Sequence, residues 1–296
     1  MRITQSMLTA RSLSDLQRSA TDMAATSQQV SSGKRISQPS DDAIGTGDAL
    51  RYRDQLSGLA QYRDNAASAT SWVSATDSAV QQVSDISQRV RELALSGANG
   101  TMDASARQAV ATEIGQLINA AKDALNAKSG DAYVFAGTAT TPPFDTTTTP
   151  PDDTSHDDGK PVIRSLGPGV SVRVDTPGST FEGLLATMRS LQTHFQSGTP
   201  ADLAAVSSTD LSNLDAAADT LSGTFATVGA TQNRIDAADA RLGDAQTTVT
   251  NLLSGVENTD YATALTTLAS QQAGYTAALK STAAVIQPSL LDYLTS

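Results

Sequence analysis

The stretch VSSGKRISQPSDDAIGTGDALR, residues 30–51, separates two long helical patterns. Gly33 is a helix stop signal, because glycine readily adopts the left-handed conformation that ends many helices. Pro39 disfavours helix in the residue before it. Asp41 and Asp42, with the preceding serine, supply an N-cap and an acidic first turn for a following helix. The stretch therefore predicts a helix, a short polar loop and a second helix.

Helical periodicity extends on both sides of this loop. Apolar residues repeat at three- and four-residue spacing through residues 3–30, and the pattern resumes from about residue 42 to 97. A helix over 42–97 would be roughly 80 Å long at 1.5 Å per residue, which is typical of a rod and not of a compact domain. Further helical patterns cover about 103–128, 181–197 and 201–257.

The middle of the chain has a different composition. Residues 131–180 contain the runs AYVFAG, PVIRS and VSVRV, separated by a tract that is rich in threonine and proline. The β-branched runs predict short strands, and the threonine–proline tract predicts an extended loop. We expect a small β-rich insertion between the helical segments.

The last helical pattern is almost free of charge. The segment ENTD, residues 257–260, shifts the phase of the apolar spacing, which then continues over 261–286 until Pro288, where we expect the helix to stop. Residues 261–291 contain a single charged side chain, Lys280. Two interpretations remain open: a helix buried in a monomeric bundle, or a helix that other subunits cover.

Composition excludes several classes of protein. The chain has no cysteine, so disulfides and thiolate chemistry are absent. Its formal net charge of −11 argues against binding nucleic acid. No apolar run approaches the length of a membrane span, and the first residues lack the apolar core of a cleaved secretory signal.

No constellation of residues indicates catalysis, a cofactor or a metal. GTGDAL, residues 45–50, lacks the third glycine of a dinucleotide motif and follows no strand. DDTSHDDGK, residues 152–160, departs from the EF-hand pattern at Thr154 and His156. We therefore expect a protein that is not an enzyme and binds no cofactor.

Motifs at both ends resemble the flagellin superfamily. SSGKRISQPSDDAIG (31–45) is similar to the segment that follows the N-terminal helix of flagellins, and NTDYATALTTLASQQAGYTAAL (258–279) is similar to their C-terminal helix. Pro39, AYVFAGTATTPPF (132–144) and LLDYL (290–294) resemble one branch, the hook-associated protein 3 family.

The resemblance implies a mainly α fold, an elongated helical rod with paired N- and C-terminal coiled-coil arms and a small β-rich insertion domain. The arms would form an assembly domain from residues 1–40 with 259–296. The rod would comprise 41–137 with 181–258, and the outer β-rich domain 138–180. The implied function is a structural adaptor that joins the flagellar hook to the filament. A filament-forming flagellin and a secreted coiled-coil effector or translocator remain as alternatives.

The implied partners are further copies of the chain, hook-associated protein 1, flagellin and a flagellar export chaperone at the C-terminal helix, with neither nucleic acid nor membrane. The protein would leave the cell by type III export and become extracellular. Apolar positions of the two arms are expected to form the assembly interface: Ile3, Met7, Leu13, Leu16, Met23, Val30, Tyr261, Leu265, Leu268, Tyr275, Leu279, Ile286, Leu290 and Leu291. The joint between arm and rod is expected to involve Gly33, Arg35, Asp41, Asp42 and Asp260.

Overall fold

The computed structural model describes residues 5–98, 102–147 and 151–294 of the chain, without the side chains of residues 5, 6, 8 and 284–294. Ile3 therefore lies outside the described residues, as do the side chains of Ile286, Leu290 and Leu291. The chain divides into two compact units, which are described separately. The first combines Met1–Gly58 with Ala245–Ser296, and the second is Leu59–Asp244.

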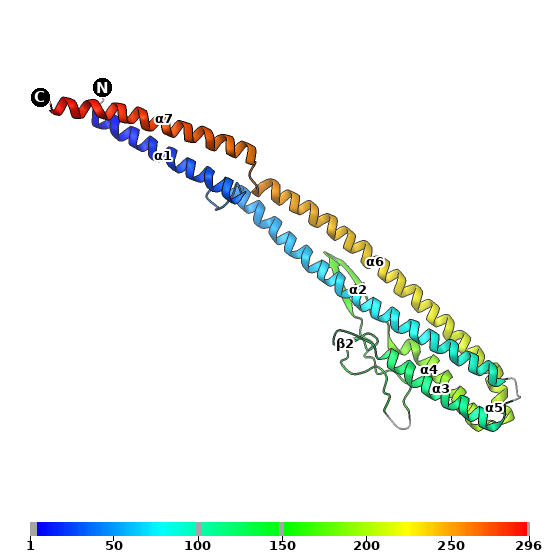
Figure 1. The fold of residues 1–296 in the computed structure, drawn as a ribbon. Helices are drawn as coiled ribbons and strands as arrows, with labels where there is room; N and C mark the ends of the chain where they lie inside the picture. Colours follow the sequence, from blue (N-terminus) through cyan, green and yellow to red (C-terminus); the bar gives the residue numbers. More distant parts are fainter. Residues whose placement is uncertain (1–4, 99–101, 148–150, 295–296) are drawn as a thin grey trace. The chain divides into compact units, whose positions relative to one another are not determined.

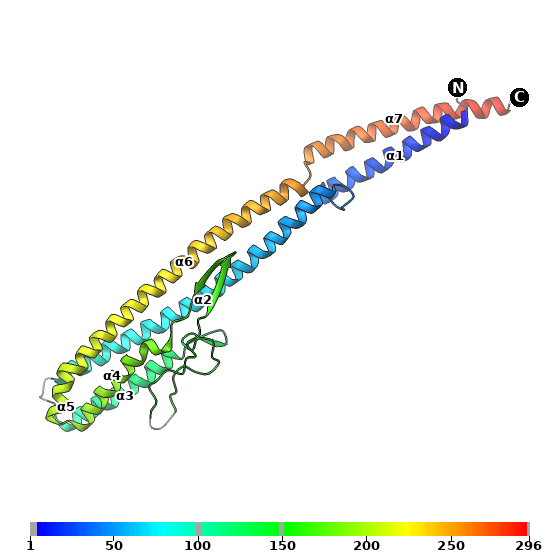
Figure 2. The same ribbon diagram turned by 180° about the vertical axis from the view of Figure 1, so that it is seen from behind.

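The first unit contains the two ends of the chain. Helix α1 (Gln5–Ser32) runs beside α7 (Tyr261–Leu294) in the opposite direction (Figures 1 and 2). The unit also holds the first turns of α2 (Ala43–Ala98) and the last turns of α6 (Leu211–Glu257). The helices break at the two places that the sequence predicts, before residue 43 and after residue 257.

The expectation that Pro288 stops the last helix is wrong, because α7 continues to Leu294. A proline inside a helix removes its own N–H hydrogen bond and disturbs the preceding turn. The residues on either side can still hold helical dihedral angles, so the helix is weakened at this point and not ended.

The second unit is built on α2 and α6, whose buried residues follow heptad spacing. On α2 the buried line alternates three and four residues through Ala66, Ala69, Val73, Thr76, Val80, Val83, Ser87, Val90 and Ala94. On α6 it repeats every seven residues through Leu214, Leu221, Val228, Ile235 and Leu242. Ion pairs between Arg63 and Asp239, and between Arg91 and Asp215, flank these lines.

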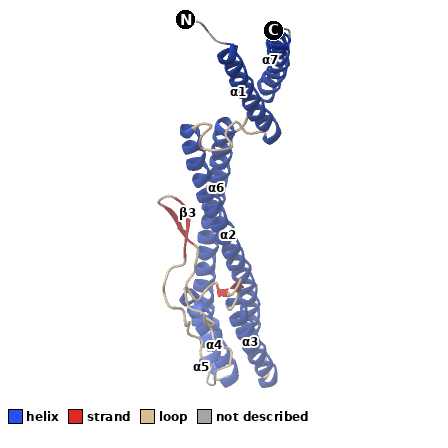
Figure 3. Cartoon of the chain, turned by 90° about the vertical axis from the view of Figure 1, so that its left-hand side faces the viewer, coloured by secondary structure: helices blue, strands red, loops and turns tan. Residues whose placement is uncertain are grey.

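Shorter elements complete this unit. Helix α3 (Ala104–Leu125) packs along α4 (Glu182–Ser197), and a 3₁₀ turn η1 (Gly178–Phe181) leads into α4. Helix α5 (Pro200–Ala205) continues through a π turn, η2 (Val206–Asp210), into α6. Figure 3 shows how little of the chain is strand.

The strands form two antiparallel pairs: β1 (Lys128–Ser129) with β2 (Ala132–Tyr133), and β3 (Ile163–Gly167) with β4 (Val170–Arg173). The sequence-based expectation of a mainly α fold with a small β-rich insertion is confirmed. Within the described part of the chain, no helix combines the length and the apolar character that crossing a membrane would require.

Candidate assembly surface and helix joint

The two breaks in the first unit are bonded to each other through their main chains. Lys34 and Asn258 form an antiparallel bridge. The Arg35 amide donates to the Glu257 carbonyl at 2.7 Å, and the Thr259 amide donates to the Gly33 carbonyl at 3.0 Å. These bonds give partners to main-chain groups that the helix ends leave without intrahelical bonds. The crossing from α1 to α2 and the crossing from α6 to α7 thus form one joint.

Gly33 makes this close approach possible. Its φ of +72° lies in the left-handed region, where a side chain is strained. A Cβ atom at this position would lie 2.6 Å from the hydroxyl oxygen of Tyr261. Glycine is required here both by its dihedral angle and by the tyrosine that covers it.

Arg35 connects the two halves of the joint with its side chain. One guanidinium nitrogen, Nη2, donates to the carbonyl oxygen of Val256 at 2.9 Å, and Nη1 donates to Asp42 Oδ2 at 3.1 Å. A cation at the C-terminal end of α6 interacts favourably with the helix dipole. The sequence singled out Arg35 together with both aspartates, and the structure pairs it with Asp42.

The two aspartates have separate partners. Asp42 Oδ1 caps α2 by accepting from the Gly45 amide at 2.9 Å, and this bond, followed by the Arg35 guanidinium, lowers the pKa of Asp42. Asp41 Oδ2 instead accepts from the main-chain amides of Ser37 and Gln38, each at 3.0 Å, and these bonds lower the pKa of Asp41. Asp42 therefore begins the helix while Asp41 shapes the loop.

Asp260 has the same capping role at the start of α7. Its Oδ2 accepts from the Thr263 hydroxyl at 2.7 Å, and its Oδ1 accepts from the Ala262 amide at 3.0 Å. The bond from the Thr263 side chain is the main cause that lowers the pKa of Asp260. Asp260 sets the first turn of α7 directly beside the joint.

Sequence reasoning missed Glu257, the last residue of α6. Its residue exposure is 8%, and its carboxylate lies 3.4 Å from Lys34 Nζ and pairs with Arg53. An anion at a helix C-terminus is unfavourable by itself, so these two cations compensate for it. One signal was available: Glu257 is the only charged residue between positions 245 and 259.

The side of α1 that faces α7 is unusually polar. Residues with reduced exposure follow one heptad line, with hydroxyl-bearing and larger apolar residues in alternation: Ser12, Leu16, Ser19, Met23, Thr26 and Val30. The three apolar members are predicted interface residues. Two others, Met7 and Leu13, are exposed by more than half of their surface. The contact between the two helices therefore leaves large apolar side chains uncovered.

On α7 the described residues that are not exposed form a single line: Ala264, Leu268, Gln271, Tyr275, Ala278 and Thr282. We call this line and its α1 counterpart the inner seam. Gln271 Oε1 is buried there without a hydrogen-bond partner. Two predicted interface residues, Leu265 and Leu279, lie off the seam and are 52% and 42% exposed. Tyr261, whose hydroxyl lies over Gly33, is 52% exposed. The large apolar side chains of α7 are thus divided, with Leu268 and Tyr275 in the seam and Leu265 and Leu279 outside it.

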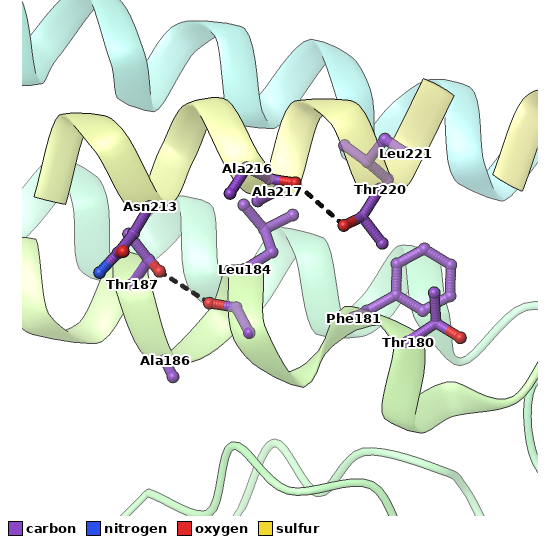
Figure 4. A pocket seen from close by; sticks show the side chains of 11 residues that line it. Thr180, Phe181, Leu184, Ala186, Thr187, Asn213, Ala216, Ala217, Thr220 and Leu221 are labelled. Carbon is purple, nitrogen blue, oxygen red and sulfur yellow. Dashed lines mark hydrogen bonds between the residues drawn. The ribbon is translucent and has the colours of Figure 1, made fainter. Parts of the chain in front are cut away.

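In the second unit, a groove of about 410 Å³ lies between α4 and α6 (Figure 4). Its lining carries no ionisable side chain, and the hydroxyls of Thr187 and Thr220 donate to the carbonyls of Gly183 and Ala216 in their own helices. The groove therefore offers apolar contacts and no group for acid–base or nucleophilic chemistry.

Comparison with known families matches both ends of the chain. The bacterial flagellin N-terminal helical region matches residues 3–140, and the bacterial flagellin C-terminal helical region matches residues 211–294. The chain belongs to the flagellin family. Members of this family are structural proteins of the bacterial flagellum, and the two matched regions contain all the helices that form the joint.

Relatives of this flagellin-family chain include a flagellin and a hook-associated protein. It is 37% identical over 91 residues to flagellin FlaB1 of Treponema pallidum, which is 31% of this chain and 32% of the relative. It is 30% identical over 147 residues to flagellar hook-associated protein 3 of Salmonella typhimurium, covering 49% of this chain and 46% of the relative. The matches span only about a third to a half of these relatives.

Solved structures support the fold over a larger part of the chain. A putative flagellar hook-associated protein from Vibrio parahaemolyticus aligns with a TM-score of 0.65 and 19% identity, over 74% of this chain and 100% of the other. Hook-associated protein 3 from Legionella pneumophila aligns with a TM-score of 0.63 and 12% identity, over 70% and 98%. Because the sequence identities are below 20%, these structural alignments show a shared fold and nothing about function.

Proposed function

We propose that this chain is a structural adaptor that joins the end of the flagellar hook, through hook-associated protein 1, to the flagellin filament. The proposal is supported by the near-complete coverage of hook-associated protein structures by this fold. It is supported as well by the short β-rich insertion between the helical halves. In this proposal, residues 1–40 with 259–296 assemble, 41–137 with 181–258 form the rod, and 138–180 form the outer domain.

The observation that carries the proposal is the distribution of uncovered apolar side chains. Of the eleven large hydrophobic residues that are exposed among the described residues, eight belong to the unit formed by the chain ends. These eight are Met7, Leu13, Ile44, Leu50, Leu252, Tyr261, Leu265 and Leu279. Apolar surface concentrated in this way is typical of a surface that other subunits cover.

Assembly is the proposed mechanism. Apart from Thr26 and Ala264, the residues of the inner seam are only partly buried, so the arm gains much of its order when neighbouring copies cover it. The remaining partners are flagellin on the filament side and an export chaperone that binds the C-terminal helix before secretion. The chain is exported by the type III route and functions outside the cell.

To test the proposal, the gene is deleted in the bacterium that carries it, and either the native gene or a gene with Leu268→Asp is then introduced. Leu268 lies in the inner seam, and a carboxylate there should prevent incorporation because it buries an unpaired charge. The native chain should restore attached filaments, whereas the variant should be secreted without filaments. Normal attachment by the variant, or no effect of the deletion, would contradict the proposal.

A filament-forming flagellin is a second candidate, favoured by the identity to the Treponema flagellin. The two candidates differ in the polymer that they form. Long filaments grown from the purified chain would favour the flagellin. A short ring at the hook end, seen by gold labelling of isolated flagella, would favour the adaptor.

A further inference from the structure

We propose that a cleft in the second unit binds an oligosaccharide with a single carboxylate, a neutral sugar chain that carries one uronic acid. The cleft has a volume of about 470 Å³ and lies where α2, the chain after β4, η1 and α6 meet. This volume is within the range of pockets that hold small ligands. The inference goes beyond the proposed function and does not depend on it.

Buried apolar side chains form the floor of the cleft. Val73 of α2, Val174 after β4 and Val228 of α6 line it, and all three are buried. The hydroxyl of Thr76, which is also buried, donates to the main-chain carbonyl of Trp72 in its own helix. Because these residues belong to the core, the floor is formed before a ligand arrives. It offers an apolar surface to the C–H face of a sugar ring.

Arg234 supplies an uncompensated positive charge to the cleft. Its exposed side chain forms no hydrogen bond or ion pair with any described residue. The other charged lining residues, Arg173 and Asp175, pair with each other at 2.7 Å, and Asp175 also accepts from the Val162 amide. The free guanidinium of Arg234 is therefore available for a ligand, and its planar shape suits two parallel hydrogen bonds to a carboxylate.

Threonine hydroxyls line the same cleft. Those of Thr176, Thr180 and Thr231 form no hydrogen bond within the part of the chain that the structure describes. Those of Thr224 and Thr227 donate to main-chain carbonyls of α6 and keep lone pairs that accept. A threonine hydroxyl both donates and accepts. The lining therefore matches the hydroxyls of a sugar, which also donate and accept.

The cleft continues into the groove between α4 and α6 that Figure 4 shows. Thr180 and Thr220 line both, so together they follow α6 from Asn213 to Arg234. This part of the helix is about 32 Å long at 1.5 Å per residue. The groove carries no ionisable side chain, and the free cation lies at the other end of the path. An elongated ligand with one terminal acid and an uncharged remainder fits this arrangement.

The net charge of −11 of the chain favours a ligand with few carboxylates. At physiological salt, charges more than about 8 Å apart are largely screened, so the groups that line the cleft decide the interaction. The carboxylate among them, on Asp175, is already paired. A polymer with an acid on every unit would gain the same single ion pair with Arg234 and meet an acidic protein along the rest of its length.

The inference is tested by NMR titration of the purified full chain with xylotriose that carries one glucuronate. We expect the amide signals of the cleft to shift. Neutral xylotetraose and glucuronate alone should each bind about tenfold more weakly, because each lacks part of the contacts. No binding of the acidic oligosaccharide would overturn the inference. Equal binding of xylotetraose would overturn the role of the carboxylate, and equal binding of glucuronate alone would overturn the role of the groove.

Arg234→Gln should weaken binding of the acidic oligosaccharide about tenfold, because it removes charge-assisted hydrogen bonds to the carboxylate. Arg241→Gln is the control. Arg241 lies one heptad further along α6 and is exposed as well, but it does not line the cleft. Both variants lose one positive charge, so equal weakening would mean a general attraction by charge and would overturn the site.

A second pair of variants blocks the cleft without changing the charge. Gly223 lines the cleft, and a Cβ atom there would meet no atom within 4 Å, so Gly223→Leu fills open space. Gly229→Leu is the control, because its Cβ also meets open space but Gly229 lies outside the lining. Leucine favours a helix more than glycine does, so both variants should stay folded.

We expect Gly223→Leu to abolish the binding of the acidic oligosaccharide and Gly229→Leu to leave it unchanged. Unchanged binding by a folded Gly223→Leu variant would overturn the location of the site. The proposed function would still stand in that case, since it depends on the attachment of filaments and not on the cleft.

Discussion

The guanidinium of Arg35 donates a hydrogen bond of 2.9 Å to the carbonyl oxygen of Val256, which lies 221 residues further along the chain. The same guanidinium bonds to Asp42, the N-cap of α2. One side chain therefore connects the end of α6 to the start of α2. This contact makes the polar loop near the N-terminus and the break near the C-terminus parts of one joint.

Replacing Arg35 by alanine should loosen the joint without unfolding the second unit. The variant loses two hydrogen bonds of a half-exposed guanidinium, which contribute on the order of 1 kcal/mol. Hydrogen exchange should then become several-fold faster at the main-chain amides of positions 35 and 259, which bond across the joint. Arg51→Ala is the control, because Arg51 contacts Asp48 and the ring of Tyr52, both on its own helix. Equal exchange in both variants would contradict this role for Arg35.

Glu257→Gln should destabilise the first unit by about 1–2 kcal/mol. The substitution keeps the size of the side chain and leaves Lys34 and Arg53 facing a neutral amide in a largely buried site. Chemical denaturation followed by circular dichroism measures the loss. Asp239→Asn, which removes an exposed ion pair with Arg63, should change stability by less than about 0.5 kcal/mol. A loss of stability for Asp239→Asn that equals or exceeds the loss for Glu257→Gln would contradict the larger contribution assigned to the ion pairs of Glu257.

Gly33→Ala tests the close approach at the joint. Alanine at a φ of +72° costs about 1 kcal/mol or more, and its Cβ would also meet the Tyr261 hydroxyl. Adding Tyr261→Phe should restore only the part of the lost stability that is due to the contact with the hydroxyl, since the strained dihedral angle remains. Thermal denaturation of the two variants separates these contributions. Full recovery would show that the dihedral angle has no cost.

The bonds between Thr138 and Asp158 should be lost only in strong acid. Bonds from the Thr138 hydroxyl and amide lower the pKa of Asp158 from its ordinary 3.8 to about 2. Because the pKa is depressed in the folded chain, the stabilisation is complete above pH 3.8 and is lost as the pH falls through about 2. The Thr138 amide resonance should therefore titrate near pH 2, and Asp158→Asn should abolish this titration. A midpoint near 3.8 would contradict the bonding.

Much of the backbone could be predicted because its signals are local. Gly33, Pro39 and the two aspartates mark the first break through dihedral preference and capping, which depend on neighbouring residues alone. Heptad spacing likewise predicts the helices. The partners of Glu257 could not be predicted, because Lys34 and Arg53 lie more than 200 residues away in the sequence.

The sequence also left the choice between adjacent heptad lines open. On α7, Leu265 and Leu279 have the larger apolar side chains, so periodicity favours them for the helix pair. The structure instead places Ala264, Gln271 and Ala278 toward α1. Likewise Leu252, at a heptad position of α6, is 47% exposed. Periodicity finds an apolar line, but only the fold determines which partner covers it.

The central claim is that the arm formed by α1 and α7 becomes fully ordered when other copies cover it. The most direct measurement is limited proteolysis of the purified chain and of the same chain in isolated flagella, with fragments identified by mass spectrometry. We predict rapid loss of about residues 1–40 and 260–296 from the purified chain and protection of both segments in flagella. Equal resistance of these segments in the purified chain would contradict the claim.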